Sequence, residues 1–336
     1  MNGSVAKRYE PEHEPDRGLQ GGYLLAAAAT ATVYIAFIAW IAGATGVFYV
    51  MFPELGALAY DVFSRPHGRW SNSPAHLATT PALTGTIGIL ITRNLSYGFA
   101  SVLLNIGSAL AVIIALGSPI APAISAGLLP LVLGVKSWWY PPGILFGTMI
   151  LAGASFPWRS LMARHVTEER RLAGRQPILA APKGWFWAIA YLAFIVMALA
   201  IVELTGLRFI LFPPLAVIGF EMFGHIESCA WADRPFRLPV VCFLAAAGGL
   251  FFHHALGATW TAAALSMAWG IALLQIFRVY VPPALAVALL PMVMTAPTLW
   301  YPCSVGLGTL ALTVWFECCR GRLEAGQKVR HSTAAA

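Results

Sequence analysis

The chain has 336 residues, of which 59% are hydrophobic and only 10% are charged. Soluble domains carry about 25% charged residues, so this composition excludes a water-exposed globular protein and predicts a polytopic membrane protein. The formal net charge of +7 comes mainly from polar tails and a central linker. In a membrane protein such charge indicates which segments face the cytoplasm, and we expect no binding of nucleic acid.

The first half of the chain combines long apolar runs with two short ones. A polar tail, residues 1–22, precedes a first repeat that we assign to residues 23–157. The short runs begin at Pro53 and Pro122 and hold about 11 and 14 residues. A helix rises about 1.5 Å per residue, so about 20 residues are needed to cross a bilayer. In order, the expected helices are 23–47, 53–63, 74–92, 97–117, 122–135 and 143–156.

The second half repeats this pattern after a basic linker. Residues 158–183 form that linker, a second repeat is assigned to 184–319, and a polar tail covers 320–336. The two halves align with an offset of 160 residues at first and 161 residues later, and prolines and tryptophans then coincide. Between 121–151 and 282–312, 12 of 31 positions are identical without a gap. The sequence therefore indicates a tandem duplication.

Basic residues gather in both tails and in the linker. Cytoplasmic segments carry an excess of Lys and Arg, so we expect all three in the cytoplasm. Each half then crosses the membrane an even number of times, which makes the repeats parallel. The expected fold class is all-α: a polytopic membrane protein of two parallel repeats, each with four long transmembrane helices and two short broken or re-entrant helices.

The starts of the short helices suggest a binding site. Irregular backbone at membrane depth is tolerated only where protein buries it or water lines it. A helix start leaves N–H groups free with a partial positive charge, and proline suits that first turn. Starts that converge near the midplane would bind an anion, although such prolines also shape loops. The proposed substrate-binding residues at these starts are Pro53, Glu54, Pro122, Pro213, Pro214, Pro282 and Pro283.

Three stretches of the second half carry a resemblance to a known family. They are Phe212-Pro213-Pro214 with the later Arg234-Pro235, Gly248-Gly249, and Val281-Pro282-Pro283-Ala284. These stretches resemble the HPP family of integral membrane proteins, whose His-Pro-Pro motif opens a short helix, and the chain looks like two such modules fused. Val281 stands in place of the motif histidine. The resemblance implies a bacterial or plastid membrane protein, proposed as a transporter, with nitrite the substrate implicated for some members.

Three carboxylates lie in the two copies of the first short helix. Glu54 follows Pro53 directly, and its counterpart in the second half is Pro214. A carboxylate inside a membrane is costly and is a functional candidate by default, so Glu54 could carry a coupling proton or could cap the helix start. Asp61 and Glu221 occupy matched positions, each eight residues after a proline. They are further candidates for proton coupling, or else the solvated ends of their helices.

Two arginines and a threonine complete the expected substrate-binding set. Arg93 and Arg278 could raise the local concentration of an anion, with helix-end anchoring as the alternative for Arg93. Thr84 and three neighbouring threonines could line a path, although threonine more often bonds to helix carbonyls. Asn105 and Ser266 share a matched position in the middle of a span. There we expect hydrogen bonds between helices.

An enzyme is the least favoured class. Glu221, His225, Glu227, Cys229 and His253-His254 could approach one another around a metal. However, this cluster is missing from the first half, and the chain has no recognised catalytic motif. We therefore expect no catalytic residues, no metal site and no cofactor.

The sequence predicts a transporter or channel-like permease for a small solute, with a small anion such as nitrite as the first candidate. A membrane scaffold or sensor that does not transport is the main alternative. We expect the chain to be integral to the bacterial cytoplasmic membrane, with both termini in the cytoplasm. Its partners would be the ion or small-molecule substrate and the lipid bilayer, and it would be a monomer or a homodimer.

Overall fold

The computed structural model describes residues 21–162 and 185–334. Within these ranges the chain forms twelve α-helices and no β-strand, so the prediction of an all-α protein is confirmed. The first half comprises α1 (Gly21–Thr45), α2 (Glu54–Ser64), α3 (Pro74–Asn94), α4 (Phe99–Leu116), α5 (Ala123–Leu133) and α6 (Tyr140–Met162). The second half comprises α8 (Phe186–Thr205), α9 (Pro213–Gly224), α10 (Arg237–Leu256), α11 (Trp260–Ile276), α12 (Pro283–Leu289) and α13 (Trp300–Ala334). Three 3-10 segments, η1 (Phe48–Val50), η3 (Arg208–Leu211) and η4 (Leu290–Val293), join them.

Helix ends lie close to the expected positions, with two exceptions. Gly46 and Gly206 follow α1 and α8 with φ of +72° each, a backbone conformation that glycine adopts without a steric cost. In contrast, α6 continues to Met162 and α13 to Ala334, through segments expected to be linker and tail. In α13, Arg320 pairs with Glu317 at 3.1 Å and Glu324 at 2.8 Å, and this spacing stabilises a helix. Residues 1–20 of the expected N-terminal tail and most of the linker lie outside the described residues, and residues 21–22 begin α1.

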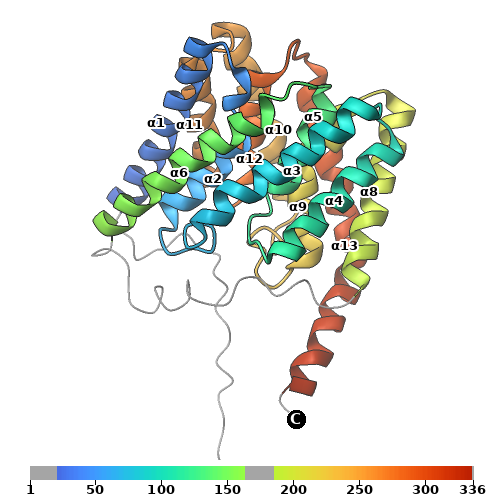
Figure 1. Ribbon diagram of the computed structural model, residues 1–336. Helices are drawn as coiled ribbons and strands as arrows, with labels where there is room; N and C mark the ends of the chain where they lie inside the picture. Colours follow the sequence, from blue (N-terminus) through green and yellow to red (C-terminus); the bar gives the residue numbers. More distant parts are fainter. Residues whose placement is uncertain (1–20, 163–184, 335–336) are drawn as a thin grey trace, which may run out of the picture.

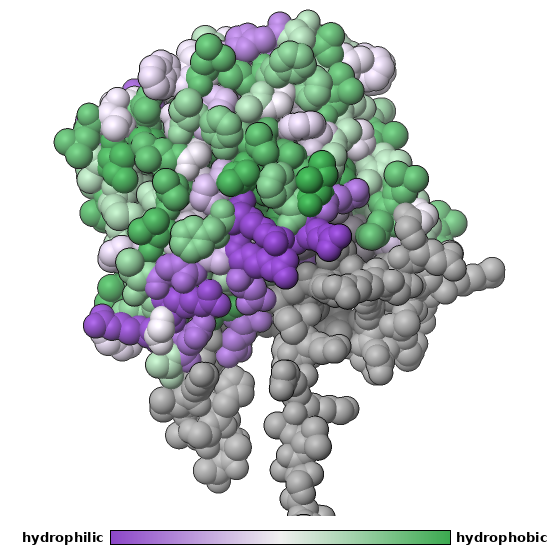
Figure 2. Space-filling view, turned by 180° about the vertical axis from the view of Figure 1, so that it is seen from behind, coloured by the Kyte–Doolittle hydropathy of each residue, from purple (hydrophilic) through white to green (hydrophobic). Residues whose placement is uncertain are grey.

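Five helices are long and apolar enough to cross a membrane, by length and composition within the described ranges. They are Gly22–Thr45, Phe99–Leu116, Phe186–Thr205, Arg237–Leu256 and Trp300–Ala325. Apolar side chains cover much of the upper and middle part of one face, and polar side chains gather below them (Figure 2). Exposed apolar residues include Leu25 and Val33 of α1, which are 69% and 67% exposed. Such a surface suits lipid better than water, and it indicates a membrane protein.

The bundle has two ends that differ in what they contain (Figure 1). Helices α1 and α8 begin at the lower end of the view, and α6 and α13 end there. The lower end also holds the α2–α3 and α9–α10 loops, whereas the upper end holds the α3–α4 and α5–α6 connections. We use the terms lower end and upper end in this sense below.

The four short helices, α2, α5, α9 and α12, form the buried centre of the bundle. Every residue of α2 and α12 is buried, and so is every residue of α5 except Leu133. In α9 only Glu221 and Gly224 are not buried. Helix α2 packs on α12, and α5 packs on α9, so each contact joins the two halves. A helix that is apolar on all sides belongs in such a centre.

Tyrosines at matched positions make the same contact in both halves. The Tyr140 hydroxyl of α6 donates a hydrogen bond to the Ala126 carbonyl of α5 at 2.7 Å. The Tyr301 hydroxyl of α13 donates to the Val287 carbonyl of α12 at 2.6 Å. In each half a long helix thus binds the backbone of a short one. This role explains why the tyrosine of the Trp-Tyr-Pro motif occurs in both halves.

Two glycines at matched positions set how closely the short helices can approach the long ones. A Cβ at Gly88 would meet the Gly127 carbonyl oxygen, and a Cβ at Gly249 would meet the Ala288 carbonyl oxygen. We predict that Gly88→Ala and Gly249→Ala each destabilise the fold by about 1–3 kcal/mol or more, because overpacking must displace backbone. Thermal unfolding in detergent would measure this loss. Gly153→Ala is the control, since nothing lies within 4 Å of its Cβ position, and a stability loss of equal size there would contradict the packing argument.

Candidate functional site

The start of α2 places a carboxyl group in the buried centre. Glu54 is the first residue of α2, and its side chain is 2% exposed. The Ser125 hydroxyl donates a hydrogen bond to Glu54 Oε1, whereas Oε2 has no hydrogen-bond partner. No described basic side chain forms a salt bridge with Glu54. A buried polar atom without a partner is costly, so Glu54 is the first candidate for function.

The contact between Glu54 and Ser125 joins two helix starts. Pro53 precedes α2 and Pro122 precedes α5, each with φ of −56°. Both prolines are buried. The structure therefore brings together the starts of the two short helices of the first half, including three of the residues expected at the site. Ser125 was not among the expected residues.

The second half offers no equivalent polar pair. The positions that match Glu54 and Ser125 are Pro214 and Ala286, and neither has a polar side chain. Helix α12 has only seven residues. The polar centre therefore belongs to the first half alone. The starts of α9 and α12 are nonetheless buried at each expected proline, namely Pro213, Pro214, Pro282 and Pro283.

Side chains seal these helix starts in the present conformation. Leu55 and Leu215 lie at matched positions in α2 and α9, and both are fully buried. Gly56 of α2 lies so close to α12 that a Cβ would come within 2.5 Å of Leu289 Cδ1. The anion site expected at the helix starts is thus closed to solvent here.

Asp61 connects α2 with the second half. Its Oδ1 accepts a hydrogen bond from Arg65 Nε at 2.8 Å and one from the Tyr280 hydroxyl at 2.7 Å. Tyr280 lies in the connection between α11 and α12, and the Arg65 guanidinium carbon is 4.3 Å from the centre of its ring. Asp61 is only 1% exposed. It is therefore not the solvated helix end considered as an alternative: it forms an ion pair with Arg65 in its own half and accepts a hydrogen bond from Tyr280 of the second half.

Glu221, at the matched position, has a different environment. It is partly exposed at the C-terminal part of α9, and Oε2 lies 3.5 Å from Nδ1 of His225. Arg65 and Arg69 are close enough to interact with it electrostatically. Arg65 therefore acts on both carboxylates, and the lower ends of α2 and α9 share one cluster of charge. Neither Asp61 nor Glu221 touches Glu54 through any described hydrogen bond or ion pair.

The remaining expected residues do not gather around Glu54. The Thr84 hydroxyl bonds to the carbonyl of Thr80 at 3.1 Å and to that of Pro81 at 3.2 Å, which is the structural role considered above. Arg93 is exposed at the upper end, and Arg278 is exposed beyond the end of α11 with φ of +49°. Since α11 descends from the upper end, the two arginines lie at opposite ends of the bundle (Figure 1).

The polar pair in the middle of α4 and α11 is also asymmetric. Asn105 Nδ2 donates to the Gly127 carbonyl of α5 at 2.9 Å, as expected for a hydrogen bond between helices. The Ser266 hydroxyl has no hydrogen-bond partner in the described part of the chain. The first half therefore retains more polar contacts in its interior than the second half.

The cluster considered for a metal does not assemble. Within the described residues, no three His, Cys, Asp or Glu side chains come together in a way that could hold a metal ion. Glu221 and His225 lie at the lower end, whereas His253 and His254 end a 20-residue helix that leads to the upper end. In the α9–α10 loop, burial and then the nearby Glu221 raise the pKa of Cys229 well above its usual value. The thiol therefore stays protonated and is a poor metal ligand.

Comparisons with known proteins add no assignment for these residues. The resemblance to the HPP family rests on the proline-started helices and Gly248-Gly249, and it remains a hypothesis. The chemistry of the buried centre follows from the residues that meet there. Neither a family model, nor a curated protein sequence, nor a solved structure matches the chain.

Proposed function

We propose that the chain is a membrane permease for a small solute, with a small anion such as nitrite as the first candidate, and that Glu54 carries a coupling proton. The observation that carries this proposal is the buried carboxyl group with one unpartnered oxygen at the start of α2. Ionisable groups inside membranes are costly, and they mark substrate pathways and proton relays. No cofactor and no metal is required.

The proposed architecture consists of two parallel repeats, residues 23–157 and 184–319, each with four long helices and two short re-entrant ones. It is supported by the shared order of long and short helices and by the matched contacts of Tyr140 and Tyr301. It is also supported by the way in which α2 packs on α12 while α5 packs on α9. Such an interface between repeats is where transporters place their substrate.

The proposed mechanism is alternating access rather than an open channel, because side chains seal the centre. An anion next to an ionised Glu54 would be repelled, whereas a protonated Glu54 removes that repulsion and offers a hydrogen-bond donor. The free N–H groups at the starts of α2 and α5 add a partial positive charge. Proton and anion would therefore enter together as a neutral pair, and both would leave when the centre opens on the other side.

The orientation of the protein follows from its charge. The basic tails and linker place both termini in the cytoplasm under the positive-inside rule, which agrees with helix ends that share the lower end of the bundle. The upper end then faces away from the cytoplasm. The HPP resemblance favours the bacterial cytoplasmic membrane. Because one chain supplies both halves, a monomer suffices, although a homodimer is compatible.

Flux measurements would test the proposed substrate. The purified chain, reconstituted in vesicles, would be challenged separately with nitrite, nitrate, formate and bicarbonate under an inward proton gradient. Uptake of at least one anion, accompanied by proton entry, is the expected result. Vesicles that hold folded protein yet take up none of the four would remove the proposal of anion transport.

A scaffold or sensor that does not transport is the second candidate, and the sealed helix starts favour it. Cysteine substitution at Leu55 and Leu215, in a chain without its native cysteines, distinguishes the two. For a permease we predict labelling of both positions by a membrane-impermeant thiol reagent during turnover, because the centre must open to water. Cysteine at Ile106, fully buried in α4, is the negative control, and cysteine at exposed Thr259 is the positive one. If Leu55 and Leu215 behave like Ile106 in every condition, the scaffold is the better description.

A further inference from the structure

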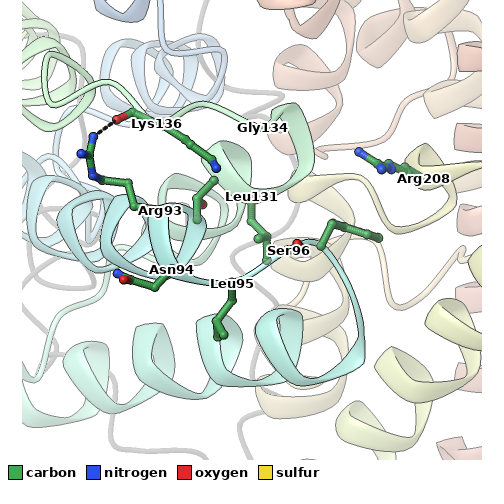
Figure 3. A pocket seen from close by; sticks show the side chains of 10 residues that line it. Arg93, Asn94, Leu95, Ser96, Leu131, Gly134, Lys136 and Arg208 are labelled. Carbon is green, nitrogen blue, oxygen red and sulfur yellow. Dashed lines mark hydrogen bonds between the residues drawn. The ribbon is translucent and has the colours of Figure 1, made fainter.

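A second feature lies at the upper end of the bundle, away from Glu54. A cavity of about 260 Å³ opens between the α3–α4 connection, the α5–α6 connection and η3. Figure 3 shows Arg93 and Lys136 on one side of this cavity and Arg208, which comes from the second half, on the other. Both halves therefore contribute to its lining.

Three positively charged side chains line the cavity, and no carboxylate is among its lining residues. Arg93, Lys136 and Arg208 line it, and no described carboxylate forms a salt bridge with any of them. Arg93 Nη1 donates to the Lys136 carbonyl at 2.8 Å, which leaves its other N–H groups available, and the Lys136 ammonium has no described partner. Three cations around one space repel one another, and an anion between them would remove this cost.

A neutral donor completes the lining. The Tyr97 hydroxyl is shielded from solvent and has no hydrogen-bond partner in the described part of the chain. The Arg208 guanidinium carbon lies 5.2 Å from the centre of the Tyr97 ring. Burial raises the pKa of Tyr97 to about 12, with Arg208 lowering it and Glu203 raising it, so at neutral pH the hydroxyl keeps its proton. The side chains that line the cavity thus offer donors at several points, which suits a ligand that has only acceptor oxygens.

The second half has no counterpart to this cavity lining. No member of the donor set is kept at the matched position. The matched pairs are Arg93 with His254, Tyr97 with Ala258, Lys136 with Pro297, and Arg208 with Phe48. Simple anchoring of helix ends at a membrane surface would apply equally to both halves. The donors therefore point to a ligand that binds in one place only.

We propose that this cavity binds a phosphate-type oxyanion, either as the head group of an anionic lipid or as free phosphate. Arginine and lysine side chains that converge on one space are the usual partners of phosphate oxygens. Trp138 and Trp139 beside the cavity are 49% and 66% exposed, and exposed tryptophans mark the level of lipid head groups. The proposal does not depend on transport through the centre.

Binding measurements on the full chain in detergent test the proposal and separate the two sources. Calorimetry with inorganic phosphate reports the free anion, and native mass spectrometry with phosphatidylglycerol against phosphatidylcholine reports the lipid. We expect Lys136→Gln and Arg208→Gln each to lower the affinity for the ligand that binds by about tenfold or more, because each loses a charged hydrogen bond. Tyr97→Phe, which removes a neutral donor, should lower this affinity less.

Arg322→Gln is the matched control, because it removes one positive charge from an exposed site on α13. If the wild-type protein retains phosphatidylglycerol and the cavity variants lose it, the ligand is the lipid. If the wild-type protein binds inorganic phosphate and the cavity variants bind it more weakly, the ligand is the free anion. The proposal is overturned if neither probe binds the wild-type protein, or if Arg322→Gln weakens binding as much as Lys136→Gln and Arg208→Gln do. Unchanged thermal unfolding of the variants would show that the fold is intact, and Lys136, Arg208 and Arg322 are all exposed.

Discussion

Glu54→Leu is expected to reduce anion flux in reconstituted vesicles to the level of empty vesicles while the protein stays folded. Leucine fills a similar volume and needs no hydrogen bond, so the variant should unfold at the same temperature as the wild type or higher. Glu54→Gln should keep the hydrogen bond from Ser125, but its amide cannot bind and release a proton. We therefore expect Glu54→Gln to lose the acceleration of uptake by an inward proton gradient.

Two further variants show whether this effect belongs to Glu54. Ser125→Ala leaves the carboxyl group but removes its hydrogen bond, so flux should fall only in part. Glu203→Gln makes the same chemical change at an exposed position near the end of α8 and should leave flux unchanged. Proton-driven uptake by Glu54→Gln at the wild-type rate would show that Glu54 carries no coupling proton. A Glu54→Leu protein that fails to fold would instead give this carboxyl group a structural role.

The order and lengths of the helices could be predicted because local signals mark them. Prolines precede the short helices, glycines with positive φ follow several helices, and apolar runs separate them. These signals act within a few residues, so they do not need the tertiary structure. The continuation of α6 and α13 into polar sequence was missed. In α13 the charged residues there form pairs along the helix rather than a solvated tail.

The contacts of the site could be predicted only in part because they join distant segments. Ser125 is 71 residues from Glu54, and Tyr280 is 219 residues from Asp61. One signal was available in the sequence: Glu54 and Ser125 are both polar, whereas Pro214 and Ala286 at the matched positions are both apolar. When two positions are both polar in one repeat and both apolar in the other, the two polar residues are candidates for a direct contact. For Tyr280 no such signal exists, because its contact crosses from one repeat to the other.

Asp61→Asn is expected to destabilise the fold by about 3 kcal/mol, at the low end of the range for breaking a buried ion pair. Asp61 is 1% exposed, and asparagine keeps an acceptor oxygen for Arg65 and the Tyr280 hydroxyl but removes the buried negative charge that pairs with Arg65. The side chain of Arg65 is 38% exposed and can be rehydrated in part, which limits the cost. Unfolding in mild detergent measures the change.

Glu317→Gln is the comparison for this pair, because Glu317 and Arg320 form an ion pair that is about one-third exposed on both sides. Such surface pairs contribute about 0–1 kcal/mol, so this variant should differ little from the wild type. Asp61→Asn should also loosen the lower end of the bundle, since Asp61 joins α2 to the second half. Cysteine at Leu55 should then react faster with a thiol reagent supplied from the lower side. Equal losses of stability for both variants, with no change in labelling at Leu55, would mean that the Asp61 contact does not hold the halves together at that end.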